Sequence, residues 1–93
     1  MPRPSRLGRN LRRIRQMRDM TQQAVCDEVR RQTGRGMSRT VIAELEAGSR
    51  QSVNLDTCIR IARALQTDLN TLVGYSLFED TDDVESEGAA ASV

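Results

Sequence analysis

Hydrophobic residues recur through most of the chain at intervals of three and four, the spacing that gathers side chains on one face of an α-helix. Before each run stands a residue whose side-chain oxygen suits the N-cap, where it accepts a hydrogen bond from an N–H of the first turn. The pattern predicts five helices, which begin after Ser5, Thr21, Ser38, Asn54 and Asp68.

The predicted core is formed by the apolar residues of these five runs. Since Tyr75 and Phe78 are the only aromatic residues, aliphatic side chains must supply most of the buried surface, which favours one helical core over a β-sandwich or barrel. Gly34 and Gly36 are expected to end the second helix, and Gly48 the third. The residues expected to face inward are Leu7, Leu11, Ile14 and Met17, then Ala24, Val25, Cys26 and Val29, then Val41, Ile42 and Leu45, then Leu55, Cys58, Ile59, Ala62 and Leu65, and finally Leu69, Leu72 and Val73.

Charge divides the chain into a basic body and an acidic tail. All 14 basic residues lie between Arg3 and Arg63, and with seven acidic residues they give residues 1–78 a net charge of +7. Residues 79–93 carry six acidic residues and no basic one, and they hold too little apolar surface to offset the entropy of ordering them. We predict a basic N-terminal arm at 1–5, a folded domain at 6–78 and a disordered tail at 79–93. A positively charged body indicates a polyanionic partner.

The residue types allow little catalytic or metal chemistry. Cys26 and Cys58 are too few for a zinc site in a chain without histidine, and both fall in apolar runs, so we interpret them as core residues. No nucleophile stands near a base, and no glycine-rich phosphate loop follows a strand. We therefore expect neither an enzyme nor a metal, cofactor or small-molecule site. The sequence has no apolar run of the roughly 18 residues that span a membrane, and its N-terminus lacks the pattern of a signal peptide. We therefore expect a cytoplasmic protein with no membrane partner.

Two segments, Thr21–Val29 and Met37–Gly48, carry a resemblance to a known family. Together with Leu7–Arg15, Asn54–Leu65 and Asp68–Leu72, they resemble the phage Cro and repressor (XRE-like) helix-turn-helix family. The resemblance implies an all-α, compact five-helix domain like that of lambda repressor, of bacterial, phage or plasmid origin.

The chain departs from the family in the connection between the second and third helices, which is longer here. Either the second helix continues past Arg30, or the turn becomes a loop that ends near Gly36. Two interpretations of the insertion stay open, a mobile loop and an additional contact to the DNA backbone.

The resemblance implies that the helix starting near Ser38 enters the major groove of double-stranded DNA and that its first residues reach base edges. Arg39, Thr40 and Glu44 occupy those positions. An arginine pairs with guanine, a threonine contacts a thymine methyl group or a phosphate, and a glutamate accepts from cytosine. The alternative for each is a solvated helix face.

Phosphate contacts are expected on both sides of that helix. Gln22 matches the family glutamine that anchors the start of the second helix to a phosphate, where N–H groups of the helix terminus also point. The full set expected to contact phosphates is Gln22, Ser38, Arg50, Asn54 and Arg13. Arg15 and Glu46 align instead with a family ion pair that ties the first helix to the third, which implies a structural role.

A domain of this size contacts few bases, so we expect a homodimer on a palindromic operator. Its expected interface consists of Leu72, Tyr75, Leu77 and Phe78, unless these residues pack onto their own domain. Two interpretations of the basic arm stay open, entry into a neighbouring minor groove and a frayed terminus.

The sequence therefore predicts a DNA-binding transcriptional regulator that acts as a repressor. The alternative is a protein-interaction module of the same fold, such as an antitoxin or an RNA polymerase adaptor. Three roles stay open for the acidic tail, namely solubility, repulsion of nonspecific DNA and competition with DNA for the basic body.

Overall fold

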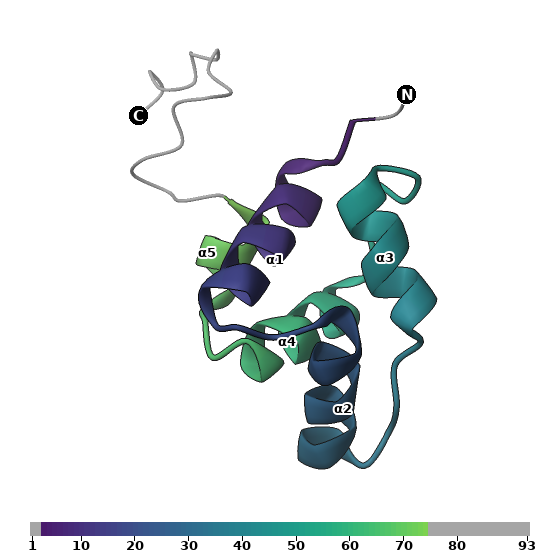
Figure 1. The fold of residues 1–93 in the computed structure, drawn as a ribbon, viewed down its shortest axis with the longest axis vertical. Helices are drawn as coiled ribbons and strands as arrows, with labels where there is room; N and C mark the ends of the chain where they lie inside the picture. Colours follow the sequence, from purple (N-terminus) through teal and green to yellow (C-terminus); the bar gives the residue numbers. More distant parts are fainter. Residues whose placement is uncertain (1–2, 75–93) are drawn as a thin grey trace.

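Residues 3–74 are described by the computed structural model, and they form five α-helices without a strand (Figure 1). The predicted all-α, five-helix fold is confirmed. The predicted acidic tail, residues 79–93, lies outside the described residues, as do residues 75–78 of the predicted domain. The helices are α1 (Arg6–Met17), α2 (Gln22–Thr33), α3 (Arg39–Ala47), α4 (Leu55–Ala64) and α5 (Leu69–Val73).

Each helix begins at its predicted N-cap. In every case the side-chain oxygen of the cap accepts from a backbone N–H two or three residues later, which satisfies one of the donors that a helix start leaves without a partner. The pairs are Ser5 with Gly8, Thr21 with Ala24, Ser38 with Thr40, Asn54 with Thr57 and Asp68 with Thr71, at donor–acceptor distances of 2.7 to 3.1 Å.

The connection between α2 and α3 is long for two reasons. Helix α2 runs three residues beyond Arg30, to Thr33, and ends at the left-handed Gly34. Residues 34–38 then form a loop that leads to the N-cap of α3. Both structural alternatives left open by the sequence thus contribute to the longer connection.

Helices α1 and α3 approach so closely that one contact requires glycine. A Cβ atom built on Gly8 would lie 2.1 Å from the carbonyl oxygen of Leu45, far inside van der Waals contact. Gly48, which ends α3 at φ 94°, adopts a left-handed conformation that other residues rarely take. Gly8 therefore sets how closely α3 lies against α1, and Gly48 leaves room for the backbone of Arg3 and Pro4.

The core forms where α4 packs against α2 and α5, while α1 packs against α3 and α5. In Figure 1, α4 crosses the middle of the molecule and α3 stands at one edge. The largest fully buried side chains are those of Leu11, Ile42, Leu45, Ile61, Leu65, Leu72, Val25 and Val29.

The burial of four residues differs from the expectations. Met17 and Leu55, predicted to face inward, are 71% and 63% exposed, because Met17 is the last residue of α1 and Leu55 the first of α4. Ile61, which the pattern missed, is fully buried. Leu72, predicted at a dimer interface, is also fully buried in its own core and has no surface left to offer a second copy. The other three residues of that interface, Tyr75, Leu77 and Phe78, lie outside the described residues.

Candidate nucleic-acid interface

Helix α3 has one face in the core and one face in solvent. Ile42 and Leu45 are fully buried, whereas Arg39 and Thr40 in its first turn are exposed. The N-cap Ser38 is exposed as well, and its side chain already accepts from the N–H of Thr40 at 3.1 Å. One face of this nine-residue helix is therefore buried, and Arg39 and Thr40, which were predicted to read bases, lie on the other.

A network of hydrogen bonds ties α3 to α1 and to the start of α2. Arg15 donates to both carboxylate oxygens of Glu46, through Nε and Nη2, each at 2.8 Å. Gln22 donates to Oε1 of Glu46 at 3.1 Å and accepts from Arg39 at 3.4 Å. The network thus runs from an ion pair inside the domain to an exposed side chain at the start of α3.

The ion pair at the base of this network is shielded from solvent. Glu46 is 7% exposed, and the side chain of Arg15 is 13% exposed. The hydrogen bonds that Arg15 donates to Glu46 raise its pKa and outweigh the effect of burial, and the negative charge of Glu46 adds to the increase, so the guanidinium stays charged. Arg15 also donates to the carbonyl of Met20 at 2.9 Å, which fixes the turn between α1 and α2.

Gln22 is placed as a link between this ion pair and Arg39. One N–H of its amide is used on Glu46, and its carbonyl oxygen is used by Arg39. A primary amide has a second N–H, which is the group that remains for a phosphate. The sequence indicated Gln22 as a phosphate contact and did not indicate that it orients Arg39.

Glu44 and Arg50 form an ion pair across the end of α3. Arg50 donates through Nε and Nη2 to the same oxygen of Glu44, at 3.0 and 2.8 Å, and both side chains are about two-fifths exposed. One was predicted to contact a base and the other a phosphate. Because a pair this exposed is worth only about 0–1 kcal/mol, both groups can exchange partners at little cost.

The remaining predicted phosphate contacts lie in two places. Asn54 is exposed at the start of α4, and its side chain caps that helix by accepting from Thr57 at 2.8 Å. Asn54 and Arg50 line one cavity, so the structure brings these two together. Arg13 lies on the exposed side of α1 and donates to Asn10 at 3.0 Å, outside the network around Glu46.

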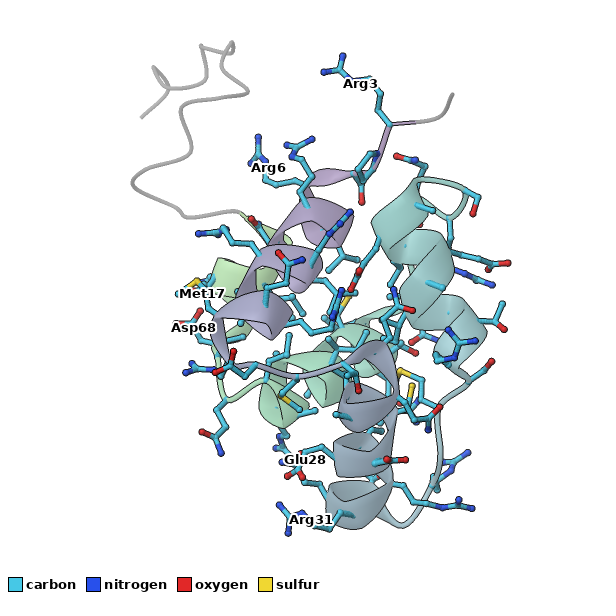
Figure 2. All side chains as sticks on the ribbon, viewed as in Figure 1. Arg3, Arg6, Met17, Glu28, Arg31 and Asp68 are labelled. Carbon is cyan, nitrogen blue, oxygen red and sulfur yellow. The ribbon has the colours of Figure 1, made fainter. Side chains whose placement is uncertain are left out.

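The described part of the basic arm lies against the end of α3. Gln51 donates to the carbonyls of Arg3 and Gly48, at 3.0 and 2.7 Å. A Cβ atom on Gly48 would lie 2.8 Å from the backbone of Arg3. In Figure 2 the Arg3 side chain projects away from the helices. The backbone from Arg3 is therefore held at the edge of the candidate interface.

Two features of the candidate interface were not predicted from the sequence. Arg60, on α4, lines the same cavity as Arg50, and no feature of the sequence near it distinguished it from the other arginines. Gln51 holds the arm by reaching a residue 48 positions away, which only the fold brings close.

Among the helices described here, none combines the length and apolar character that crossing a membrane requires.

Comparison with known proteins supports one family assignment. Residues 11–72 match the family described as helix-turn-helix, a span that runs from the middle of α1 into α5 and contains α2 and α3 entirely. The curated proteins and the solved structures gave no match to the chain.

Proposed function

Because the chain belongs to the helix-turn-helix family, in its Cro and repressor type, it is a DNA-binding regulator, and we propose that it is a sequence-specific repressor. In this proposal α3 lies in the major groove of double-stranded DNA, with its first turn against the base edges.

The observation that carries the proposal is the exposure of Arg39 and Thr40 on a helix whose other face is buried. An arginine in this position can donate two hydrogen bonds to O6 and N7 of guanine, and a threonine can contact a thymine methyl group. Glu44 accepts from cytosine once its partner Arg50 turns to a phosphate. The network from Glu46 through Gln22 supports Arg39, which favours a defined orientation over a freely rotating side chain.

Phosphate contacts hold α3 in register in this proposal. Gln22 and Ser38 approach one strand with the N-terminal ends of α2 and α3, where backbone N–H groups favour an anion. Arg50 and Asn54 approach the backbone at the start of α4, and Arg13 adds attraction from α1. Such contacts position the protein and leave the reading of sequence to α3.

We propose a homodimer on a palindromic operator, because one α3 contacts too few bases to find a single site in a genome. With Leu72 committed to the core, the proposed interface consists of Tyr75, Leu77 and Phe78. A cytoplasmic location follows from the proposed partner.

The test is a selection of binding sites from random duplexes, followed by affinity measurements with Arg39→Ala and with Arg63→Ala as control. Arg63 is exposed on α4 and lies outside the proposed interface. We expect Arg39→Ala to cost about 1–3 kcal/mol on the selected site and to relax the preference at one base pair. An unchanged preference would remove Arg39 from base reading. A tight protein partner together with no salt-dependent duplex binding would favour the interaction module instead.

A further inference from the structure

A cavity of about 210 Å³ opens beside α3, between the α2–α3 loop and the first half of α4. Its lining is partly apolar, with Met37 and Val41, and partly polar, with Arg50, Asn54, Thr57 and Arg60. Its volume far exceeds the roughly 15 Å³ that a single water needs, so the site has room for a larger polar group.

Arg60 lines this cavity, and one nitrogen of its guanidinium group has no partner among the described residues. Its Nη2 pairs with Asp56 at 3.0 Å, while its Nε is buried and hydrogen-bonds to nothing among the described residues. Buried donors, above all those of a charged group, are nearly always paired in folded proteins, because leaving one unpaired costs about 1–3 kcal/mol. The unpaired Nε belongs to a guanidinium that lines a polar cavity, which favours an acceptor from outside the chain. Because the Nε atom itself is buried, such an acceptor reaches it once the Arg60 side chain turns towards the cavity.

The surroundings of Arg60 favour an anion as that acceptor. Arg50 supplies a second guanidinium, and the N-terminal end of α4 adds the positive end of its helix dipole. The neighbouring carboxylates do not fill the cavity: Asp56 is 73% exposed, and Glu44 pairs with Arg50 on the surface. Neither Asp56 nor Glu44 is among the residues that line it.

We infer that this cavity receives a phosphate group, with Arg60 as its inner donor and Arg50 at its rim. The group is either a phosphodiester of bound DNA, which rests on the proposed function, or the phosphate of a small ester. A fork of guanidinium N–H groups suits a phosphate better than it suits a halide, because two donors can meet two oxygens. The longer α2–α3 connection has a role here, since Gly36 and Met37 of the loop complete the wall.

The first experiment uses the protein without DNA. Inorganic phosphate is titrated at constant ionic strength while the Nε–H resonances of the arginines are followed by NMR. We expect the Arg60 resonance to shift saturably and that of Arg63, three residues further along α4, to stay in place.

Thr57→Glu provides the matched variant for this titration. It puts a carboxylate beside Arg60, and at the third position of α4 a glutamate joins Asn54 in a capping box, which supports the helix start. We expect the folded variant, checked by its melting curve, to lose the response to phosphate.

The second experiment measures duplex binding over a range of salt concentrations for Arg60→Gln and for Arg63→Gln. The slope of log K against log salt is negative, and a lost phosphate contact reduces its magnitude by about 0.9. We expect that change with Arg60→Gln, together with about tenfold weaker binding, and less than about half that change in slope with Arg63→Gln.

The two experiments separate the two sources of the phosphate. A changed slope for Arg60→Gln supports the DNA phosphodiester, and a phosphate response with an unchanged slope supports a small phosphate ester. No response to phosphate and no difference between the two variants in slope would overturn the inference. A parent protein that binds no duplex at low salt would refute the proposed function alone, because the phosphate titration uses no DNA.

Discussion

Replacement of Glu46 by alanine is the most informative single change in this protein. It removes the acceptor of two hydrogen bonds from Arg15 and one from Gln22, and it leaves a guanidinium that is only 13% exposed without its counter-charge. Removing one partner of a buried ion pair typically costs 3–5 kcal/mol, because the other charge stays buried and uncompensated.

The lower end of that range applies here. Arg15 keeps its hydrogen bond to the carbonyl of Met20, so part of its polar surface stays satisfied. We expect a loss of about 3 kcal/mol. For a domain of this size, where 1 kcal/mol shifts the melting temperature by about 4–8 °C, the melting temperature should fall by roughly 15 °C.

Melting curves by circular dichroism measure this loss, and a double variant separates the ion pair from its packing. Arg15→Met combined with Glu46→Leu removes both charges and keeps apolar volume, so its stability should lie within about 1 kcal/mol of the parent. DNA affinity of Glu46→Ala should fall on every duplex alike, because the support of Gln22 and Arg39 is lost together. The reasoning is refuted if Glu46→Ala melts within about 3 °C of the parent protein, or if its affinity falls at one operator base only.

Three further changes test other parts of the fold. Gly8→Ala should destabilise the domain by about 1–3 kcal/mol in urea titrations, because the alanine methyl group would lie 2.1 Å from the carbonyl oxygen of Leu45. An unchanged urea midpoint would show that α1 and α3 move apart at no cost. Arg18→Ala should lower the free energy of unfolding by about 1 kcal/mol in the same titrations, since Arg18 donates to the carbonyls of Leu65 and Gln66, at 2.6 and 3.0 Å. Arg12→Ala is the exposed control, and an equal loss of stability in both variants would count against a stabilising role of these two hydrogen bonds. Hydrogen bonds from Thr71 lower the pKa of Asp68 below its ordinary 3.8, so the stabilisation by its carboxylate is present above about pH 4 and is lost as the pH falls through the lowered pKa. Asp68→Asn still caps α5, and its melting temperature should depend less on pH over that range. An equally steep fall of the melting temperature in the variant would exclude Asp68 as its cause.

The helix starts could be predicted because capping is a local interaction. A side-chain oxygen at Ser38 or Asn54 needs only a backbone N–H two or three residues away, so the residue type and its position carry the information. The exposed start of α3 followed for a similar reason, since Ile42 and Leu45 define the buried face and Arg39 lies off it.

Burial at helix ends was harder to predict, because it depends on what lies opposite. Met17 and Leu55 have the right spacing for the core, yet both are exposed, since Met17 is the last residue of α1 and Leu55 is the first of α4. Ile61 is buried because α4 is enclosed between α2 and α5, a setting that no local pattern contains.

In the candidate site, too, local features could be predicted from the sequence and contacts between separate elements could not. Residue types and spacing along the chain were sufficient to identify a basic helical domain, its caps and the exposed turn of α3, because these depend on neighbours a few positions away. Packing alone brought Glu44 to Arg50, Gln22 to Arg39 and the arm to Gln51. It also buried the Nε of Arg60 without a partner among the described residues. Those contacts join separate elements, and the direction in which a long polar side chain turns depends on which acceptors the completed fold puts within its reach.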